Sequence, residues 1–103
     1  MSVSFFAIYR VPEDKAAFDK SYFEQHVPIV AKWPGIVETR IHKVTQPLGG
    51  SPELHVITEI VFASKEDAMA ALGSEPGKES AQDLASWGGD KLITVMLAEP
   101  VDL

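Results

Sequence analysis

The sequence predicts an α+β fold in which one four-stranded antiparallel sheet is covered by helices on one face. Three observations lead to this prediction: four short segments rich in β-branched and aromatic residues, stretches with helical spacing of apolar residues, and their order β-α-β-β-α-β. A chain of 103 residues is near the usual size of one domain and is long enough to bury a modest core. We therefore expect a single domain that spans residues 1–103.

The first half of the chain predicts a strand, a helix and a second strand. Residues 3–9 (VSFFAIY) are aromatic and β-rich, and Pro12 follows them, so we expect the first strand here. From Asp14, a residue type that caps helices, the spacing becomes helical and continues to the WPG motif at 33–35. Residues 36–46 are dense in β-branched residues and predict the second strand.

The second half of the chain predicts a hairpin partner, helices and a last strand. Prolines and glycines cluster at 47–52 and predict a turn, so that residues 53–63 return as an antiparallel partner. Ser64 and Asp67 approximate a capping box for a helix that Gly73 ends. The remaining predicted elements are a short helix at 76–86 and a strand at 91–99. This order is the split βαβ pattern of a ferredoxin-like sandwich.

Both faces of the predicted sheet carry apolar residues. Alternation along 53–63 places Val56 and Ile60 on one face, and His55 and Glu59 on the other together with further apolar residues. Helices on one side leave the second apolar face without a cover, and such a face invites association. We therefore expect a homodimer formed by sheet-to-sheet packing about a two-fold axis.

Composition and charge exclude several classes of partner and site. The chain has 9 Lys and Arg against 15 Asp and Glu, a net charge of −6, so nucleic acid is not an expected partner. It has no cysteine, which excludes disulfides and thiolate catalysis. The first 15 residues have no basic region, and their apolar run is too short to span a membrane. We expect a cytoplasmic protein with no membrane partner.

The helical stretch after Asp14 carries the candidate site. The residues that share its predicted inward face are Phe18, Tyr22, His26, Ile29, Val30 and Trp33. Pro28 lacks an N–H and its ring crowds the carbonyl of Glu24, so the helix should bend or break and open a gap beside His26.

An imidazole, a phenol and an indole among apolar walls would suit a small, largely apolar ligand that carries an oxygen. We predict that His26 and Tyr22 are catalytic and that Phe18 and Trp33 contact the substrate. In the alternative interpretation, His26 is a core histidine that donates one hydrogen bond to a carbonyl freed by Pro28, and Phe18 and Trp33 are ordinary core residues.

Polar residues on the strands give a second set of candidates. Arg40 and His42 alternate on one face of their strand, and with Glu59 they are predicted to bind substrate in a pocket at the dimer interface. The alternative is that they are solvated or pair across the hairpin. The three histidines lack the spacing of metal ligands, so no metal site is expected. Without a glycine-rich phosphate loop between a strand and a helix, a nucleotide cofactor is not expected either.

One segment of the chain resembles a known family. FDKSYFEQHVPIVAKWPGI, residues 18–36, resembles the FDxxYYxxxHxPL segment of the EthD family, within the dimeric α/β-barrel superfamily. PELHVITEIVFASKEDAMAAL and EPGKESAQDLASWGGDKLITVMLAE resemble the short, single-domain branch of that family. The residues that correspond to the family's motifs are Tyr22, His26 and Pro28, followed by Asp83 and Trp87 in the later region. Phe23 stands where the family more often has tyrosine, which removes one hydroxyl.

The resemblance implies a ferredoxin-like fold, a dimer that packs two sheets, and chemistry without a cofactor. Members of the superfamily include cofactor-independent lactone isomerases, polyketide cyclases and monooxygenases, while others bind or degrade haem. We expect an oxidoreductase or an isomerase/lyase that acts on a small apolar oxygenated or aromatic metabolite, in catabolism or polyketide-like chemistry. Two alternatives stay open: a non-catalytic ligand-binding or accessory protein of an oxygenase system, and a haem-handling protein.

Overall fold

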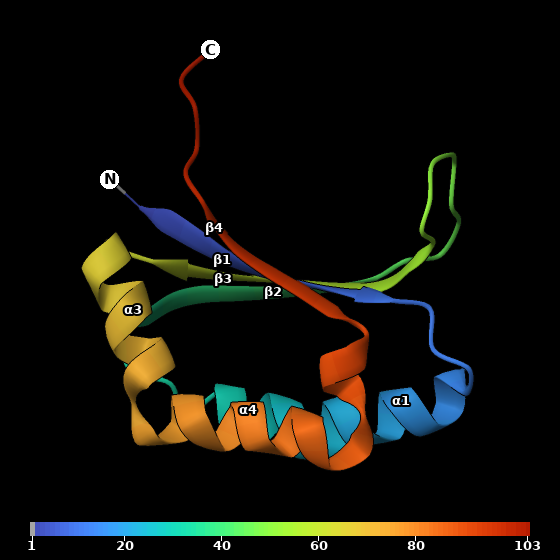
Figure 1. Ribbon diagram of the computed structural model, residues 1–103. Helices are drawn as coiled ribbons and strands as arrows, with labels where there is room; N and C mark the ends of the chain where they lie inside the picture. Colours follow the sequence, from blue (N-terminus) through green and yellow to red (C-terminus); the bar gives the residue numbers. More distant parts are fainter. Residues whose placement is uncertain (1) are drawn as a thin grey trace.

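A computed structural model of the chain describes residues 2–103. It contains one four-stranded antiparallel sheet of order β2-β3-β1-β4, and the helices lie on one face of this sheet (Figure 1). The strands are β1 (Val3–Arg10), β2 (Ile36–Lys43), β3 (Leu54–Phe62) and β4 (Ile93–Ala98). This is the ferredoxin-like α+β fold that the order of the elements predicts.

The helical segments follow the predicted order and differ from the prediction at some ends. They are α1 (Lys15–Ser21), the π-helical turn η1 (Tyr22–His26), α2 (Val27–Val30), α3 (Lys65–Gly73), α4 (Glu75–Trp87) and the 3₁₀ turn η2 (Gly89–Lys91). Asp14 caps α1 and Ser64 caps α3, as predicted, since each side chain accepts a backbone N–H three residues later. The last strand begins at Ile93 rather than 91 because η2 precedes it.

A π-helical turn interrupts the first helix just before Pro28. The Val27 N–H reaches back to the carbonyl of Tyr22, a step of five residues in place of four. In an α-helix, side chains four residues apart drift by about 40° at each step, so a run of such positions leaves the inward face. The extra residue of η1 absorbs this drift. The buried side chains at this spacing are Phe18, Tyr22, His26 and Val30.

A β-bulge near the start of β3 corrects one prediction. Tyr9 pairs with Val56 and Arg10 pairs with Leu54, so His55 is left over and its side chain turns toward the helices. There its Nε2 lies 2.8 Å from Asp19 Oδ1, and its ring packs edge-on against Phe18. The prediction that His55 shares a face with Glu59 is therefore wrong. Simple alternation along a strand fails wherever an extra residue enters the ladder.

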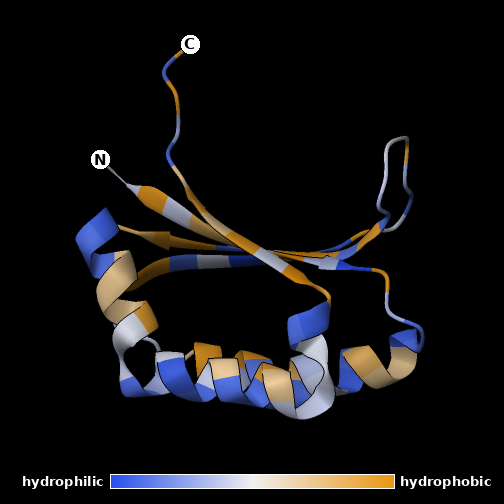
Figure 2. Cartoon of the chain, viewed as in Figure 1, coloured by the Kyte–Doolittle hydropathy of each residue, from blue (hydrophilic) through white to orange (hydrophobic). Residues whose placement is uncertain are grey.

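The core lies between the sheet and the helix layer. Its sheet side comes mainly from β1 and β3, and hydrophobic residues recur along the strands (Figure 2). The helix layer adds Phe18, Tyr22, Trp33 and Leu84. Among residues 2–103, no helix is long and apolar enough to cross a membrane.

The sheet face opposite the helices is open. Side chains of Phe6, Ile8 and Met96 lie on it, because each alternates with a residue that packs against the helices. The β2–β3 connection and the residues after β4 both project to this side, away from the helix layer (Figure 1).

Candidate functional site

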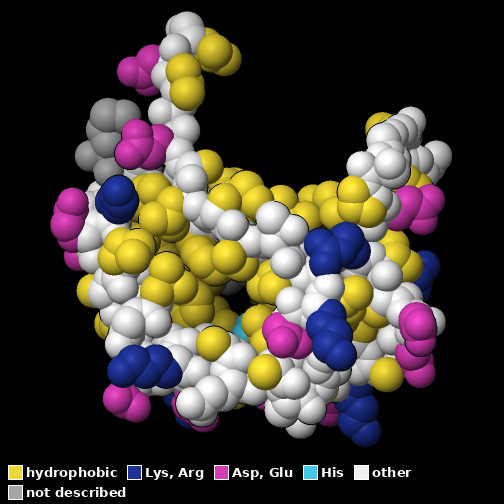
Figure 3. All heavy atoms as spheres, in the orientation of Figure 1, with side chains coloured by type: hydrophobic (Ala, Val, Ile, Leu, Met, Phe, Trp, Pro, Cys, Tyr) yellow, Lys and Arg dark blue, Asp and Glu magenta, His cyan; other side chains and the backbone are white. Residues whose placement is uncertain are grey.

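A cavity of about 510 Å³ lies between the sheet and the helix layer. Figure 3 shows this hollow with hydrophobic side chains around it and a histidine side chain inside. Its lining residues include exposed side chains on both edge strands, Thr39 on β2 and Val95 on β4, and Val95 is 51% exposed. The cavity therefore extends to both edge strands of the sheet, and its volume suits a small molecule.

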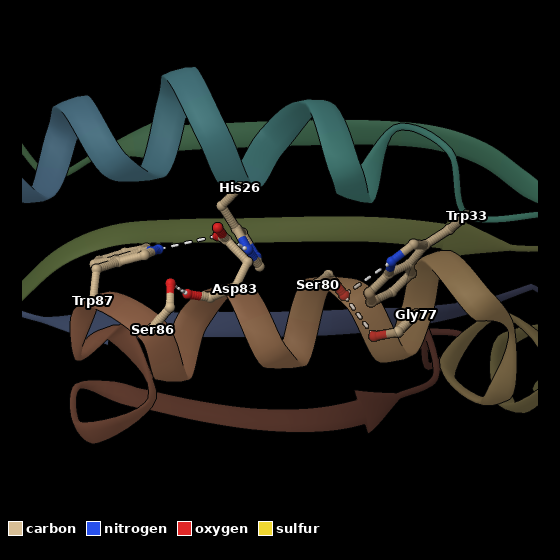
Figure 4. Close-up of polar contacts among 7 residues, drawn as sticks. All are labelled: His26, Trp33, Gly77, Ser80, Asp83, Ser86 and Trp87. Atoms are coloured by element: carbon tan, nitrogen blue, oxygen red, sulfur yellow. Dashed lines mark hydrogen bonds and ion pairs between the residues drawn. The ribbon is translucent and has the colours of Figure 1, made fainter.

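His26 enters this cavity from the π-helical turn and is held by a carboxylate of α4. Its Nδ1 lies 3.2 Å from Asp83 Oδ2, and the Trp87 indole N–H donates to the same oxygen at 3.0 Å (Figure 4). A carboxylate can only accept hydrogen bonds, so in the neutral ring Nδ1 carries the proton. Asp83 thereby fixes both the tautomer and the orientation of the imidazole.

The second ring nitrogen of His26 faces the cavity. His26 is one of the lining residues, and no hydrogen bond joins its Nε2 to another group among residues 2–103. Within this described part of the chain, every fully buried side-chain nitrogen or oxygen has a hydrogen-bond partner. Nε2 is therefore accessible, and in the neutral tautomer it presents a lone pair to whatever occupies the cavity.

Burial sets the protonation state of His26. Removal from water lowers the pKa of His26 below its ordinary value, and the hydrogen bond and charge of Asp83 oppose this lowering only in part. At neutral pH the ring is therefore neutral and able to accept a proton. This is the state that a general base requires.

Tyr22 supports His26 through its ring and has its hydroxyl engaged. The two rings stack with centroids 5.5 Å apart. The Tyr22 hydroxyl makes a hydrogen bond with Thr58 Oγ1, in which either oxygen can be the donor. Burial raises the pKa of Tyr22, and the bond to Thr58 offsets this in part, so the phenol keeps its proton. Tyr22 and Thr58 each carry one hydroxyl proton. One of these two protons forms the hydrogen bond between them, so the other can be donated to a further group.

The other predicted residues of the helix divide between the cavity and the core behind it. Trp33 lines the cavity, and its Nε1–H donates to Ser80 Oγ at 3.1 Å (Figure 4). Phe18 is not among the lining residues of this cavity. Its ring lies 5.5 Å from that of Tyr22 and 5.4 Å from that of Trp87, between centroids. Phe18 thus supports the site from behind, whereas the prediction has it in contact with substrate.

The predicted strand residues lie on the opposite face of the sheet from the cavity. Arg40 pairs with Glu38 at 2.8 Å and with Glu59 at 3.3 Å, and Glu59 also accepts from Ser4. His42 is exposed on the same side. The structure therefore does not bring these residues together with His26. A role for them in a pocket at a dimer interface stays a prediction.

Two residues of the site were missing from the candidates. Asp83 was marked by the family resemblance alone, because it lies 57 residues from His26 along the chain. Tyr9 looks like ordinary strand core in the sequence, yet it lines the cavity. Its free hydroxyl depends on packing that no local pattern encodes.

The site offers few groups for a metal or a phosphate. Among residues 2–103, no group of three or more His, Asp or Glu side chains is placed to hold a metal ion. The residues that line the cavity include no lysine or arginine. Their ionisable members are His26, Asp90 and the two tyrosines, Tyr9 and Tyr22.

Comparison with known proteins identifies relatives of the chain. The EthD domain matches residues 10–87. An uncharacterized 11.0 kDa protein of the thcB–thcC intergenic region of Rhodococcus erythropolis is 32% identical over 80 residues, 78% of each chain. An ethyl tert-butyl ether d (EthD) family protein from Bacillus halodurans is 31% identical, with a TM-score of 0.89 over 98% of this chain and 100% of that one. A hydroxynitrile lyase from Passiflora edulis, 15% identical, shares the fold, with a TM-score of 0.78 over 99% and 95% of the two chains.

Proposed function

The chain belongs to the EthD domain family, and we propose that it is an acid–base enzyme acting on a small, largely apolar molecule bound beside His26. The substrate carries an oxygen and is aliphatic or aromatic, and the reaction uses no dedicated cofactor. The observation that carries this proposal is the neutral imidazole held by Asp83, with its Nε2 open to an apolar cavity.

In this proposal His26 moves a proton on or off the substrate. Nε2 accepts a proton from a carbon or an oxygen, and the Asp83 carboxylate stabilises the imidazolium that forms. A positioned acid–base group of this kind supplies about 10²–10⁴-fold in rate. The stacked Tyr22 ring limits the orientations of the imidazole, and the Tyr22–Thr58 pair has a spare hydroxyl proton for a developing negative charge.

The first test asks whether a ligand binds beside His26, and it uses the other two histidines of the chain as controls. His26 lines the cavity, His55 is equally buried but bonded to Asp19, and His42 is exposed. NMR signals of the three rings are followed with and without a panel of small phenols, quinones and lactones. We expect one or more compounds to shift the His26 signals alone. Shifts that appear equally at His55 and His42, or nowhere, would contradict a ligand site beside His26.

The second test separates catalysis from binding. His26→Gln keeps a polar side chain of similar length but cannot take up a proton near neutral pH. We expect this variant to bind the compound found in the first test and to lose its conversion. A compound that wild-type protein binds and returns unchanged would instead make the chain a ligand-binding protein.

We further propose that two copies of the chain pack through their open sheet faces. This face carries apolar side chains, among them Met96, which is 39% exposed. The β2–β3 connection and the C-terminal residues project on either side of this face, and hydrophobic side chains lie between them (Figure 3). Met96→Lys should shift the protein toward monomer in sedimentation, because it places a charge in the apolar contact. Met69→Lys is the control, since Met69 is 53% exposed on α3; equal effects of both would argue against this interface.

A further inference from the structure

Tyr9 places a free phenol in the cavity. The residue is 1% exposed and lines the cavity from β1. No hydrogen bond joins its hydroxyl to another group among residues 2–103, although every fully buried polar side-chain atom of this range has a partner. The hydroxyl oxygen is therefore accessible from the cavity and free to bind a ligand.

The rings around Tyr9 connect it to the acid–base group. Its ring packs edge-on against that of Tyr22, with centroids 5.1 Å apart, and Tyr22 in turn stacks on His26. Burial, aided by Tyr22 and Asp83, raises the pKa of Tyr9, so its phenol stays protonated and acts as a hydrogen-bond donor. The cavity thus holds a donor on the sheet side and a base on the helix side.

The electrostatics of the cavity disfavour an anionic ligand. No lysine or arginine lines it, while Asp90 is among its lining residues and the carboxylate of Asp83 lies behind His26. A carboxylate or phosphate on the ligand would lose its water here without gaining a positive partner. An uncharged molecule with one oxygen to receive the Tyr9 proton fits these surroundings.

We propose that the substrate is an uncharged carbonyl compound with an acidic C–H next to the carbonyl, and that Tyr9 is a further catalytic residue. Tyr9 donates a hydrogen bond to the carbonyl oxygen while His26 acts on the neighbouring carbon. This inference rests on the proposed function, and it adds a substrate class and a second catalytic group, the Tyr9 hydroxyl.

The step balances without any further reactant. His26 Nε2 takes the proton from the carbon, and the C–H electron pair forms a C=C bond to the carbonyl carbon. The carbonyl π pair moves onto the oxygen, where the Tyr9 O–H stabilises the resulting enolate. Nε2 then returns the proton to the same carbon, or to another carbon of an unsaturated compound, which is an isomerisation.

The experiment measures proton exchange in 2-tetralone, an uncharged aromatic ketone. In deuterium oxide, loss of its α-proton signals is followed by NMR with wild-type protein, Tyr9→Phe, His26→Gln and buffer alone. We expect wild-type protein to accelerate exchange over buffer, and Tyr9→Phe to lose about 100-fold of that acceleration. Tyr9→Phe removes a hydroxyl that has no partner, so it should unfold at the same urea concentration as wild type.

Each outcome bears on a different part of the inference. A Tyr9→Phe rate within about 3-fold of wild type would remove Tyr9 from the catalytic residues, because an oxyanion donor is worth far more. If wild-type protein did not accelerate exchange, the proposal that the substrate is a carbonyl compound would be wrong. The proposed function would still be tested separately, by the NMR signals of the histidines and by the conversion assay. Acceleration that survives in His26→Gln would overturn the proposed function itself. Binding of 2-naphthoate as tight as that of 2-tetralone would contradict the preference for an uncharged ligand.

Discussion

Gly77→Ala should destabilise the protein, although alanine is the better helix former. Gly77 lies in the first turn of α4, against the last turn of α3. A Cβ at this position would stand 2.3 Å from the carbonyl oxygen of Ala71 and 2.6 Å from that of Leu72. Carbon and oxygen approach to about 3.3 Å, so the two helices must separate by about 1 Å. Both obstacles are backbone atoms, and no side-chain rotation relieves them.

The magnitude follows from two opposing contributions. Overpacking of a close contact costs about 1–3 kcal/mol, and a shift of two whole helices belongs at the upper end of this range. The gain in helix propensity on replacing glycine by alanine is about 1 kcal/mol. We expect the free energy of unfolding to fall by about 2 kcal/mol, which corresponds to about 8–16 °C in Tm for a domain of this size.

Gly73→Ala supplies the matched control for this prediction. Gly73 ends α3, four residues before Gly77, and a Cβ there would have open space around it. Its substitution should leave the free energy of unfolding unchanged or raise it by up to about 1 kcal/mol. Urea unfolding of both variants at one protein concentration, followed by circular dichroism, gives the comparison. Equal stability of the two variants would refute the close contact between α3 and α4.

Three further predictions concern residues that line the cavity or lie directly behind its wall. Asp83→Asn keeps an oxygen for both N–H donors but removes the charge, so the pKa of His26 should fall further, as NMR titration would show; an unchanged pKa would contradict the pairing. Because burial lowers the pKa of folded His26, only the unfolded chain gains this proton as the pH first falls below about 6.5. The free energy of unfolding should therefore decrease as the pH falls, until the pKa of folded His26 is reached. In His26→Gln this decrease should be smaller. If urea unfolding gave the same dependence of the free energy on pH for wild type and variant, the low pKa of His26 would be contradicted. Trp33→Phe removes the donor to Ser80 and should cost about 1–2 kcal/mol in the same assay, whereas an unchanged midpoint would show that this bond contributes nothing.

Local patterns in the sequence account for the fold and for half of the site. Alternation and capping residues predicted the order of the strands and helices, because each signal lies within a few residues of the structure it forms. Helical spacing likewise placed Tyr22 and His26 on the inward face. Both side chains are buried there, and Pro28 marked the region where the helix is irregular.

What local patterns missed depends on contacts between distant segments. Asp83 becomes a partner of His26 only when α4 packs beside the first helix, and its sequence surroundings are those of any exposed helix. His55 changes face because the pairing of β1 with β3 leaves it unpaired, which is a property of two strands together. The Tyr9 hydroxyl is free because the polar side chains near it form hydrogen bonds with other groups, as Tyr22 does with Thr58.

Because of the π-helical turn, the geometry of the site depends on the number of residues in this helical segment. Each residue of an α-helix advances by about 100°, so losing one residue from 22–26 would let the backbone close into a regular helix. The segments before and after the turn would then be rotated against each other. Phe18 and His26 would no longer be buried on the same side of the helix. Replacing side chains on the outer surface of this helix leaves that relation intact, so descendants of this gene should vary there in composition while keeping its length.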